Sequence, residues 1–194
     1  LTPLPQIGNM LDALGPSFQF FHDSLDFRRR NHHSINDTHH RFKMFVNNTD
    51  SVEEEVGRVA QFLYQTSRDW CVSYVIDSNH DRALLRWLKN GDYKNDPVNA
   101  VFFLKAQAAV YTAIENGLDP FNVLEWAVRY LPPDLSSVIF LDQTDSMLVL
   151  NVEHALHGDK GANGAKGAVS SFAKAGPKAT TADKHAAEIY EGIY

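Results

Sequence analysis

The chain has 194 residues, of which 44% are hydrophobic and 22% are charged, and its formal net charge is −6 at pH 7. These values indicate one ordinary globular domain with a real core, and no apolar run approaches the roughly 18 residues of a membrane span. The first residues have no signal-peptide pattern, the single cysteine excludes an internal disulfide, and the acidic balance argues weakly against a nucleic-acid partner.

The first predicted elements are a helix and a short strand. Apolar residues recur at helical spacing over 4–14, and Gly15-Pro16 ends that helix. Residues 18–21 read as a buried strand that runs directly into an acidic segment. The order of a helix, a Gly-Pro pair that ends it, a strand and then acidic residues is typical of a layered α/β protein. Because the chain opens at Leu1 inside a helix, we expect it to be part of a longer protein.

Residues 28–44 form a polar, irregular stretch that is rich in arginine and histidine. It reads either as a solvated loop or as a loop that faces a substrate. In the second reading, guanidinium groups hold phosphates in a bidentate fashion, and imidazole and amide groups donate to bridging oxygens. The candidate substrate-binding residues in and around this stretch, with one from a later glycine-rich loop, are His22, Arg28, Arg30, His32, His33 and Lys160.

A helix and the most strongly apolar strand follow. Ser51 with Glu54 forms the pattern of a capping box, and an apolar stripe continues from there over 52–63. Residues 70–77 are then β-branched and aromatic, and the run stops at 78–81, which reads Ser-Asn-His-Asp. Open α/β sheets bind ligands at the carboxyl ends of their strands, so we expect this loop to be functional.

The second half of the chain alternates helices and strands. Helices are expected over 81–88, 98–115 and 119–130, and we read 92–135 as a helical insertion within the domain. Strands are expected over 137–141, 147–152 and 178–182, with the first two joined as a hairpin around 142–146. A short helix is expected over 168–175.

Four strand ends carry candidate metal ligands: Asp23 with Asp26, Asn79 with His80, His154 with His157, and Asp183 with His185. Carboxylate, amide oxygen and imidazole together suit Mn²⁺, Fe or Zn²⁺ better than Ca²⁺. Two metals about 3.5–4 Å apart need a bridging carboxylate, and Asp23 stands first after its strand. A single histidine near a strand end is more often structural, so the hypothesis depends on the joint occurrence of the four.

These segments carry a family resemblance. The block His22-Asp23-Ser24-Leu25-Asp26 resembles the G-D-x-x-D block of the calcineurin-like metallophosphoesterases, which include the Mre11-type nucleases, and Ser78-Asn79-His80-Asp81 resembles their G-N-H-D/E block. His157-Gly158 resembles their single-histidine block, and Ala182-Asp183-Lys184-His185 stands where their closing G-H-x-H block falls. The resemblance covers nearly the whole chain and is strongest to phage-encoded members; the Asn-His-Asp block is its most specific motif.

The resemblance implies a fold and a site. The fold would be a layered β-sandwich core flanked by helices (α/β/β/α), forming one catalytic domain over 1–194 that is truncated at both ends. Two divalent metal ions, with Mn²⁺ preferred and Mg²⁺, Fe or Zn²⁺ as alternatives, would be held by Asp23, Asn79, His157, Asp183 and His185. His80 would act on the leaving group, with Asp26 or Asp81 orienting it.

Three departures from the family pattern matter. The first block, D-x-H, is absent from the chain, so two ligands of the first metal are missing. His22 replaces a glycine at a tight turn, where it either donates to a phosphate or packs. Asp183 replaces a histidine, which either tilts the preference toward Mn²⁺ or Mg²⁺ or weakens the site.

We therefore expect a metal-dependent phosphodiesterase, and first of all a DNA nuclease that holds the phosphate backbone without sequence preference. The alternatives are a phosphomonoesterase or nucleotide phosphatase, and a catalytically inactive member that serves as a binding or assembly module. The expected location is the cytoplasm, which would be the host's if the chain is phage-encoded. No membrane partner is expected, and a homo-oligomer stays open.

Overall fold

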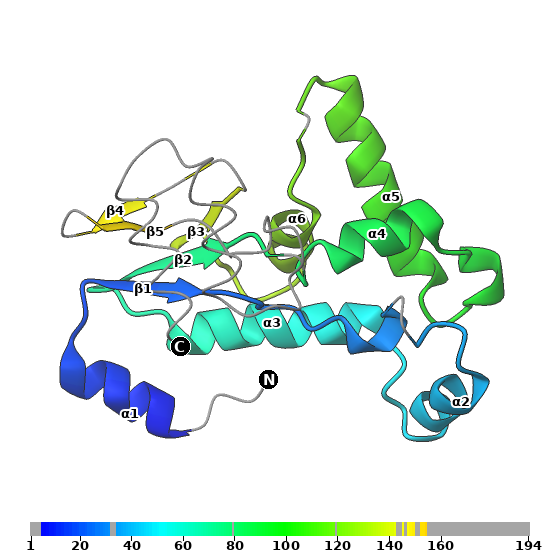
Figure 1. Ribbon diagram of the computed structural model, residues 1–194, viewed down its shortest axis with the longest axis horizontal. Helices are drawn as coiled ribbons and strands as arrows, with labels where there is room; N and C mark the ends of the chain where they lie inside the picture. Colours follow the sequence, from blue (N-terminus) through cyan, green and yellow to red (C-terminus); the bar gives the residue numbers. More distant parts are fainter. Residues whose placement is uncertain are drawn as a thin grey trace, which may run out of the picture.

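A small parallel sheet organises the computed structural model, which describes residues 5–31, 34–78, 80–118, 120–142, 145, 147–149 and 152–154 (Figure 1). Its strands β1 (Phe18–Phe21), β2 (Val72–Ile76) and β3 (Val138–Leu141) lie in the order β1-β2-β3. Both pairings are parallel, with Phe21 opposite Val75 and Ile76 opposite Leu141. The carboxyl ends of all three strands therefore meet at one edge.

Helices and a separate hairpin complete the described structure. The helical elements are α1 (Pro5–Leu14), η1 (Arg28–Arg30), α2 (Thr38–Val46), α3 (Val52–Thr66), α4 (Ala83–Asn90), η2 (Tyr93–Asn95), α5 (Ala100–Glu115) and α6 (Val123–Tyr130). The hairpin strands β4 (Met147–Val149) and β5 (Val152–His154) pair antiparallel, with Met147 opposite His154. Among the described residues, no helix is long and apolar enough to cross a bilayer.

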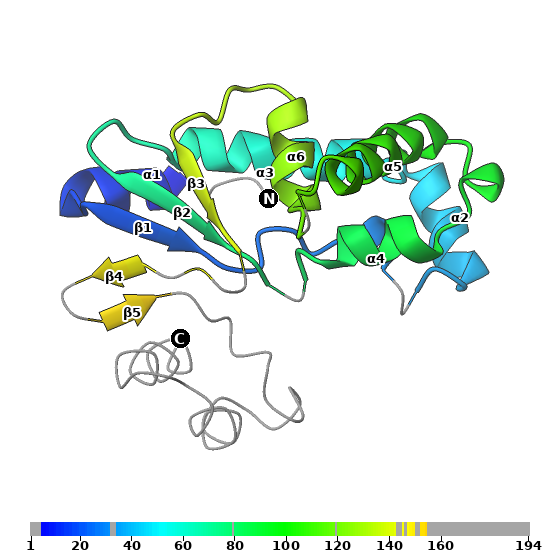
Figure 2. The same ribbon diagram turned by 90° about the horizontal axis from the view of Figure 1, so that it is seen from above.

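The main core lies on the face of the sheet that α3 and α6 cover (Figure 2). The Ser51 side chain caps α3 by accepting a hydrogen bond from the Glu54 backbone N–H at 3.2 Å, as the capping pattern predicts. The stripe that begins at Val52 is buried along the length of the helix and packs against Val75 and Val138 of the sheet. Short-range spacing therefore predicts this element correctly, because its cap and its apolar face are both local.

The opposite face of the sheet is also apolar. Phe18, Phe20 and Tyr74 form an aromatic cluster there, and the rings of Phe20 and Tyr74 stack with centroids 5.2 Å apart. Met147 of β4 packs against this cluster, and Figure 1 draws the hairpin on the side of the sheet away from α3. Both faces of the sheet thus carry apolar side chains, as is general for parallel sheets.

The α/β class is confirmed, and two local predictions are wrong. Residues 28–44 were predicted to be irregular but contain η1 and most of α2, which begins because the Asp37 carboxylate accepts from the backbone N–H groups of His39 and His40. The hairpin predicted between 137–141 and 147–152 does not form, because β3 pairs in parallel with β2, and the second segment divides into β4 and β5, which pair with each other in a separate sheet. The predicted elements over 168–182 lie outside the described residues.

The segment 92–135 is helical, as predicted, and it does not stand apart from the domain. Phe102, Phe103 and Ala106 of α5, and Val123 and Val128 of α6, all belong to the same buried cluster as the residues of α3 and the sheet. The aromatic side chains of this segment therefore serve packing within the common core.

Candidate active site

Three acids stand directly beyond the three strands, at the carboxyl edge of the sheet. Asp23 is two residues beyond β1, and Asp77 and Asp142 come directly after β2 and β3. The backbone N–H of Asp77 donates to Leu141 O at 3.0 Å, so the two strand ends remain in register to this point. The sequence prediction included Asp23 but missed Asp77 and Asp142, although each is the first polar residue after an apolar strand.

A sharp turn after β1 presents the acids of the first block. Asp23 and Phe27 both adopt the left-handed conformation, with φ of 50° and 48°. Aspartate tolerates this region, whereas a bulky residue such as phenylalanine is held there by its surroundings. The Phe27 side chain is fully buried, as is that of Leu25. Asp26, which lies between these two inward-pointing side chains, is exposed, and so is Asp23.

Asp81 joins the loop after β1 to the loop after β2. Its carboxylate accepts from the backbone N–H of Leu25 at 2.8 Å and from Ser78 Oγ at 2.8 Å, and the residue is only 3% exposed. Burial, with a smaller contribution from the charges of Asp23 and Asp77, raises the pKa of Asp81 to about 6 against the opposing effect of these hydrogen bonds. Asp81 therefore positions the two loops.

Asp26 is the acid that faces His80. His80 Nδ1 lies 3.6 Å from Asp26 Oδ1, and both side chains are about half exposed. Asp26 is itself paired with the guanidinium of Arg28. Two acids were expected to orient His80. Asp26 has the suitable geometry, since the Asp81 carboxylate accepts hydrogen bonds from Leu25 and Ser78 instead. The distance is longer than a hydrogen bond.

The basic residues of the predicted substrate-binding loop divide into two kinds. The Arg28 side chain is 81% exposed, which fits contact with a substrate. The Arg30 side chain is 1% exposed and donates to both carboxylate oxygens of Asp96, at 2.5 and 2.6 Å, and to Asp50 at 2.5 Å. Burial would lower the pKa of Arg30, but these hydrogen bonds and charges raise it. Arg30 therefore has a structural role, and the predicted phosphate contact does not fit its geometry.

Seven of the predicted site residues lie outside the described part of the chain: His32, His33, Asn79, His157, Lys160, Asp183 and His185. Of the five predicted metal ligands, Asp23 is described, and its exposed carboxylate at the edge of the sheet suits an oxygen ligand for Mn²⁺ or Mg²⁺. Within the described ranges, no group of three or more His, Cys, Asp or Glu side chains is arranged to hold a metal ion. His22 is half-buried at the end of β1.

A cavity of about 240 Å³ opens beside the second and third strand ends, lined by Asp77, Asp81 and Asp142 among others. Arg82 Nη1 lies 3.8 Å from Asp77 Oδ2. Asn122 Nδ2 donates to Asp142 Oδ1 at 3.2 Å. The strand ends thus border a mainly apolar hollow with acids at its rim, at the edge where open α/β sheets keep their ligands.

Comparison with known proteins gives one phage relative. Protein A1 of Escherichia phage T5 is 36% identical to this chain over 187 residues, which is 95% of this chain and 34% of that protein. The chain therefore spans about a third of the length of this relative. No family model matches the chain, and no solved structure matches it.

Proposed function

We propose that this chain provides the catalytic core of a metal-dependent phosphodiesterase, and that its substrate is DNA. The observation that carries the proposal is the parallel pairing of β1 with β2, which brings Asp23 and Asp26 to the same edge as His80. Aspartates and a histidine from adjacent strand ends are the groups that phosphoryl transfer by a two-metal site requires. The motifs around them are those that resemble the metallophosphoesterase blocks.

The described residues take distinct parts in this proposal. Asp23 would be an oxygen ligand at the end of β1. His80 would donate a proton from Nε2 to the departing oxygen, while Asp26 holds the ring through Nδ1. Asp81 would keep the loops of Asp23 and His80 in register through its hydrogen bonds to Leu25 and Ser78. Arg28, which is paired with Asp26, would contact the phosphate backbone.

Two divalent cations, with Mn²⁺ preferred, would supply polarisation of the phosphoryl group and the attacking water when bound. The proposed ligands beyond Asp23 are Asn79, His157, Asp183 and His185. Binding through phosphates gives affinity without sequence preference and makes it salt-dependent.

We further propose that the fold is the layered α/β/β/α sandwich. The apolar second face of the sheet, with its cluster of Phe18, Phe20 and Tyr74, supports a second sheet that includes β4 and β5. The similarity to a phage T5 protein supports a phage origin and hence action in the host cytoplasm.

Plasmid nicking by the full-length protein in Mn²⁺ tests the proposal. We expect the wild type to bind two metal ions per chain and to nick supercoiled DNA. The His80→Ala variant should lose roughly 10²–10⁴-fold in rate, the usual contribution of a general acid, while binding metal normally. Asp23→Asn should lose metal as well as activity.

The matched control is His39→Ala, which removes an exposed histidine from α2 and leaves the Asp37 cap intact, because that cap uses backbone N–H groups. It should cleave DNA at the wild-type rate. A full-length protein that binds no metal would refute the enzymatic proposal and favour the inactive module. Cleavage of phosphomonoesters but not of DNA would favour the phosphatase.

A further inference from the structure

The outward face of α5 is apolar along most of its length. Val101, Leu104 and Tyr111 are 64%, 47% and 63% exposed, and Ala108 between them is exposed as well. These four residues, called the α5 seam below, stay uncovered by the part of the chain that the structure describes. Figure 1 shows the carboxyl-terminal half of α5 rising beyond the other helices. Because monomeric proteins rarely expose large contiguous apolar patches, this face indicates an interaction surface.

The opposite face of α5 already belongs to the core. Phe102, Phe103 and Ala106 are buried in the main cluster, and Val110 packs against it. The helix is therefore apolar on both sides, and helices of this kind are generally covered on both. The core covers one side only, so the seam is the side that remains for a partner.

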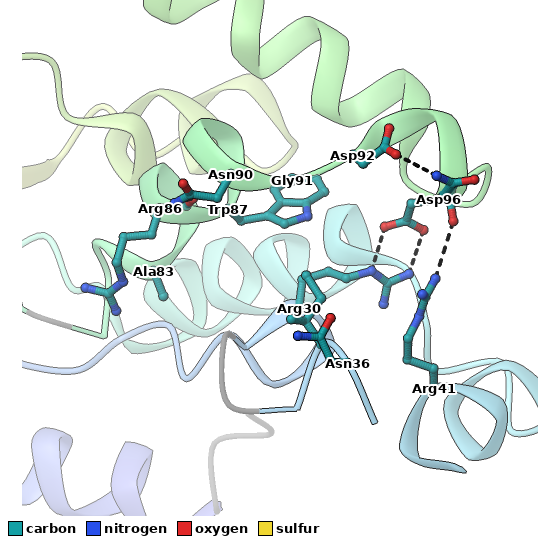
Figure 3. Close-up of a pocket in the computed structure, with 12 residues that line it drawn as sticks. Arg30, Asn36, Arg41, Ala83, Arg86, Trp87, Asn90, Gly91, Asp92 and Asp96 are labelled. Carbon is teal, nitrogen blue, oxygen red and sulfur yellow. Dashed lines mark hydrogen bonds and ion pairs between the residues drawn. The ribbon is translucent and has the colours of Figure 1, made fainter. Parts of the chain in front are cut away.

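The start of α5 is fixed to the domain. Asn99, which precedes the helix, accepts from the backbone N–H of Val52 at 2.7 Å and donates to Asp96, and Asp96 in turn pairs with Arg30 (Figure 3). Since the Asn99 side chain is used in this way, no side chain caps the first turn of α5. That turn keeps the partial positive charge of a helix amino terminus.

The seam has the spacing of a two-helix contact. Its members are three, four and three residues apart, as are the a and d positions of a coiled coil. An antiparallel second copy of α5 that brings Leu104 opposite Ala108 also brings Val101 opposite Tyr111. Each larger side chain then faces a smaller one in all four layers. The seam is therefore complementary in size to itself, as a two-fold interface requires.

Charges favour the same alignment. Glu115 is exposed one step further along the seam, and it would lie beside the uncapped first turn of the second copy, where the helix dipole attracts an acid. A parallel pair would instead place Glu115 against Glu115 and Ala108 against Ala108, which joins like charges and leaves a gap. A nucleic acid does not fit this face, because Lys105, the single cation of α5, lies over the ring of Tyr130 at 5.3 Å.

We propose that two copies of this protein associate through the α5 seam, with their α5 helices antiparallel. The interface uses no residue of the candidate active site and so does not depend on the proposed function. A contact of four layers is smaller than that of a permanent dimer, and we expect a dissociation constant of about 1–100 µM.

Sedimentation equilibrium of the full-length protein tests the association. The wild type should show a concentration-dependent dimer, and Leu104→Glu and Tyr111→Glu should each raise the dissociation constant at least tenfold, since each would bury an unpaired carboxylate. The matched control is Phe42→Glu, which makes the same change at an aromatic residue of α2 that is 67% exposed. It should dimerise as the wild type does, and circular dichroism of every variant checks the fold.

Cross-linking tests the orientation. An air-oxidised mixture of the Leu104→Cys and Ala108→Cys proteins should form a disulfide-linked pair, whereas either protein alone should not. The proposal is overturned if the wild type is a monomer at about 100 µM, if Tyr111→Glu dimerises normally, or if the single-cysteine proteins cross-link with themselves, as parallel helices would. A monomeric wild type that Tyr111→Glu destabilises in urea also overturns it, because another segment of the same protein then covers the seam.

Discussion

Replacing Arg30 by methionine tests whether this arginine is structural. The Arg30 side chain is 1% exposed and its partners Asp96 and Asp50 are 9% and 13% exposed. The substitution removes the cation and leaves Asp96 buried without it. Breaking a buried ion pair in this way costs about 3–5 kcal/mol, against a total stability of roughly 5–15 kcal/mol for a domain. We therefore expect a large fall in the free energy of unfolding.

The matched comparison is Arg28→Met, which removes the same charge and shape from a side chain that is 81% exposed. An exposed ion pair contributes less than about 1 kcal/mol, so this variant should unfold almost as the wild type does. Urea denaturation followed by circular dichroism measures both. DNA affinity should respond in the opposite order, because Arg28 is exposed and paired with Asp26, the acid that faces His80, whereas Arg30 is buried.

A double variant separates loss of the ion pair from loss of packing. In Arg30→Met/Asp96→Asn the more buried of the two partners is neutral and only Asp50 stays charged, so the double variant should be more stable than Arg30→Met by at least about 1 kcal/mol. If Arg30→Met has wild-type stability while its affinity for DNA falls, Arg30 binds the substrate and the structural interpretation is refuted.

Three further predictions concern stability and use urea denaturation. Gly91→Ala should destabilise the fold by about 1–3 kcal/mol, because the new Cβ would lie 2.6 Å from Trp87 O. Gly57→Ala, in the middle of α3 with only an ordinary 3.9 Å contact, should stabilise it by about 0.5–1 kcal/mol; equal effects at the two sites would contradict the packing argument. Ser51→Ala removes the cap of α3 and should cost about 1 kcal/mol, and no change would mean that the cap is dispensable. For Asp81 the folded-state pKa of about 6 lies above the ordinary 3.8. The contribution of this group to the free energy of unfolding is therefore complete below about pH 4 and is lost as the pH rises through 6. In EDTA, wild-type stability should thus fall relative to Asp81→Asn over that interval, by roughly 3 kcal/mol, and parallel pH profiles would refute the assigned pKa.

The carboxyl edge of the sheet shows how far sequence reasoning reached at the candidate site. Residues 18–21 were predicted as a strand and form β1, and 70–77 were predicted as a strand that contains β2. The rule that ligands collect at strand ends predicted that the loops after these two strands meet, and in the structure Asp26 of the first loop lies 3.6 Å from His80 of the second. That rule could not separate the roles of Asp26 and Asp81. Asp81 follows His80 directly in the chain, and Asp26 belongs to the motif after the neighbouring strand, so either acid could have oriented the histidine. Only the tertiary structure shows that the Asp81 carboxylate is buried, where it accepts a hydrogen bond from the backbone N–H of Leu25.

Sequence by itself determined the elements whose signals are local: the Ser51 cap, the apolar stripe of α3, and the apolar runs of β1 and β2. Tertiary structure decided the partners of residues far apart in the chain. The parallel pairing of β3 with β2 places Asp142 at the site, and Asp96 reaches Arg30 across 66 residues of sequence. The local sequence does not show whether a charged side chain will be buried or exposed. The same residue type, arginine, serves both in a buried ion pair and in an exposed contact with a substrate. The fold alone therefore makes Arg30 structural and leaves Arg28 exposed, paired with the Asp26 that faces His80.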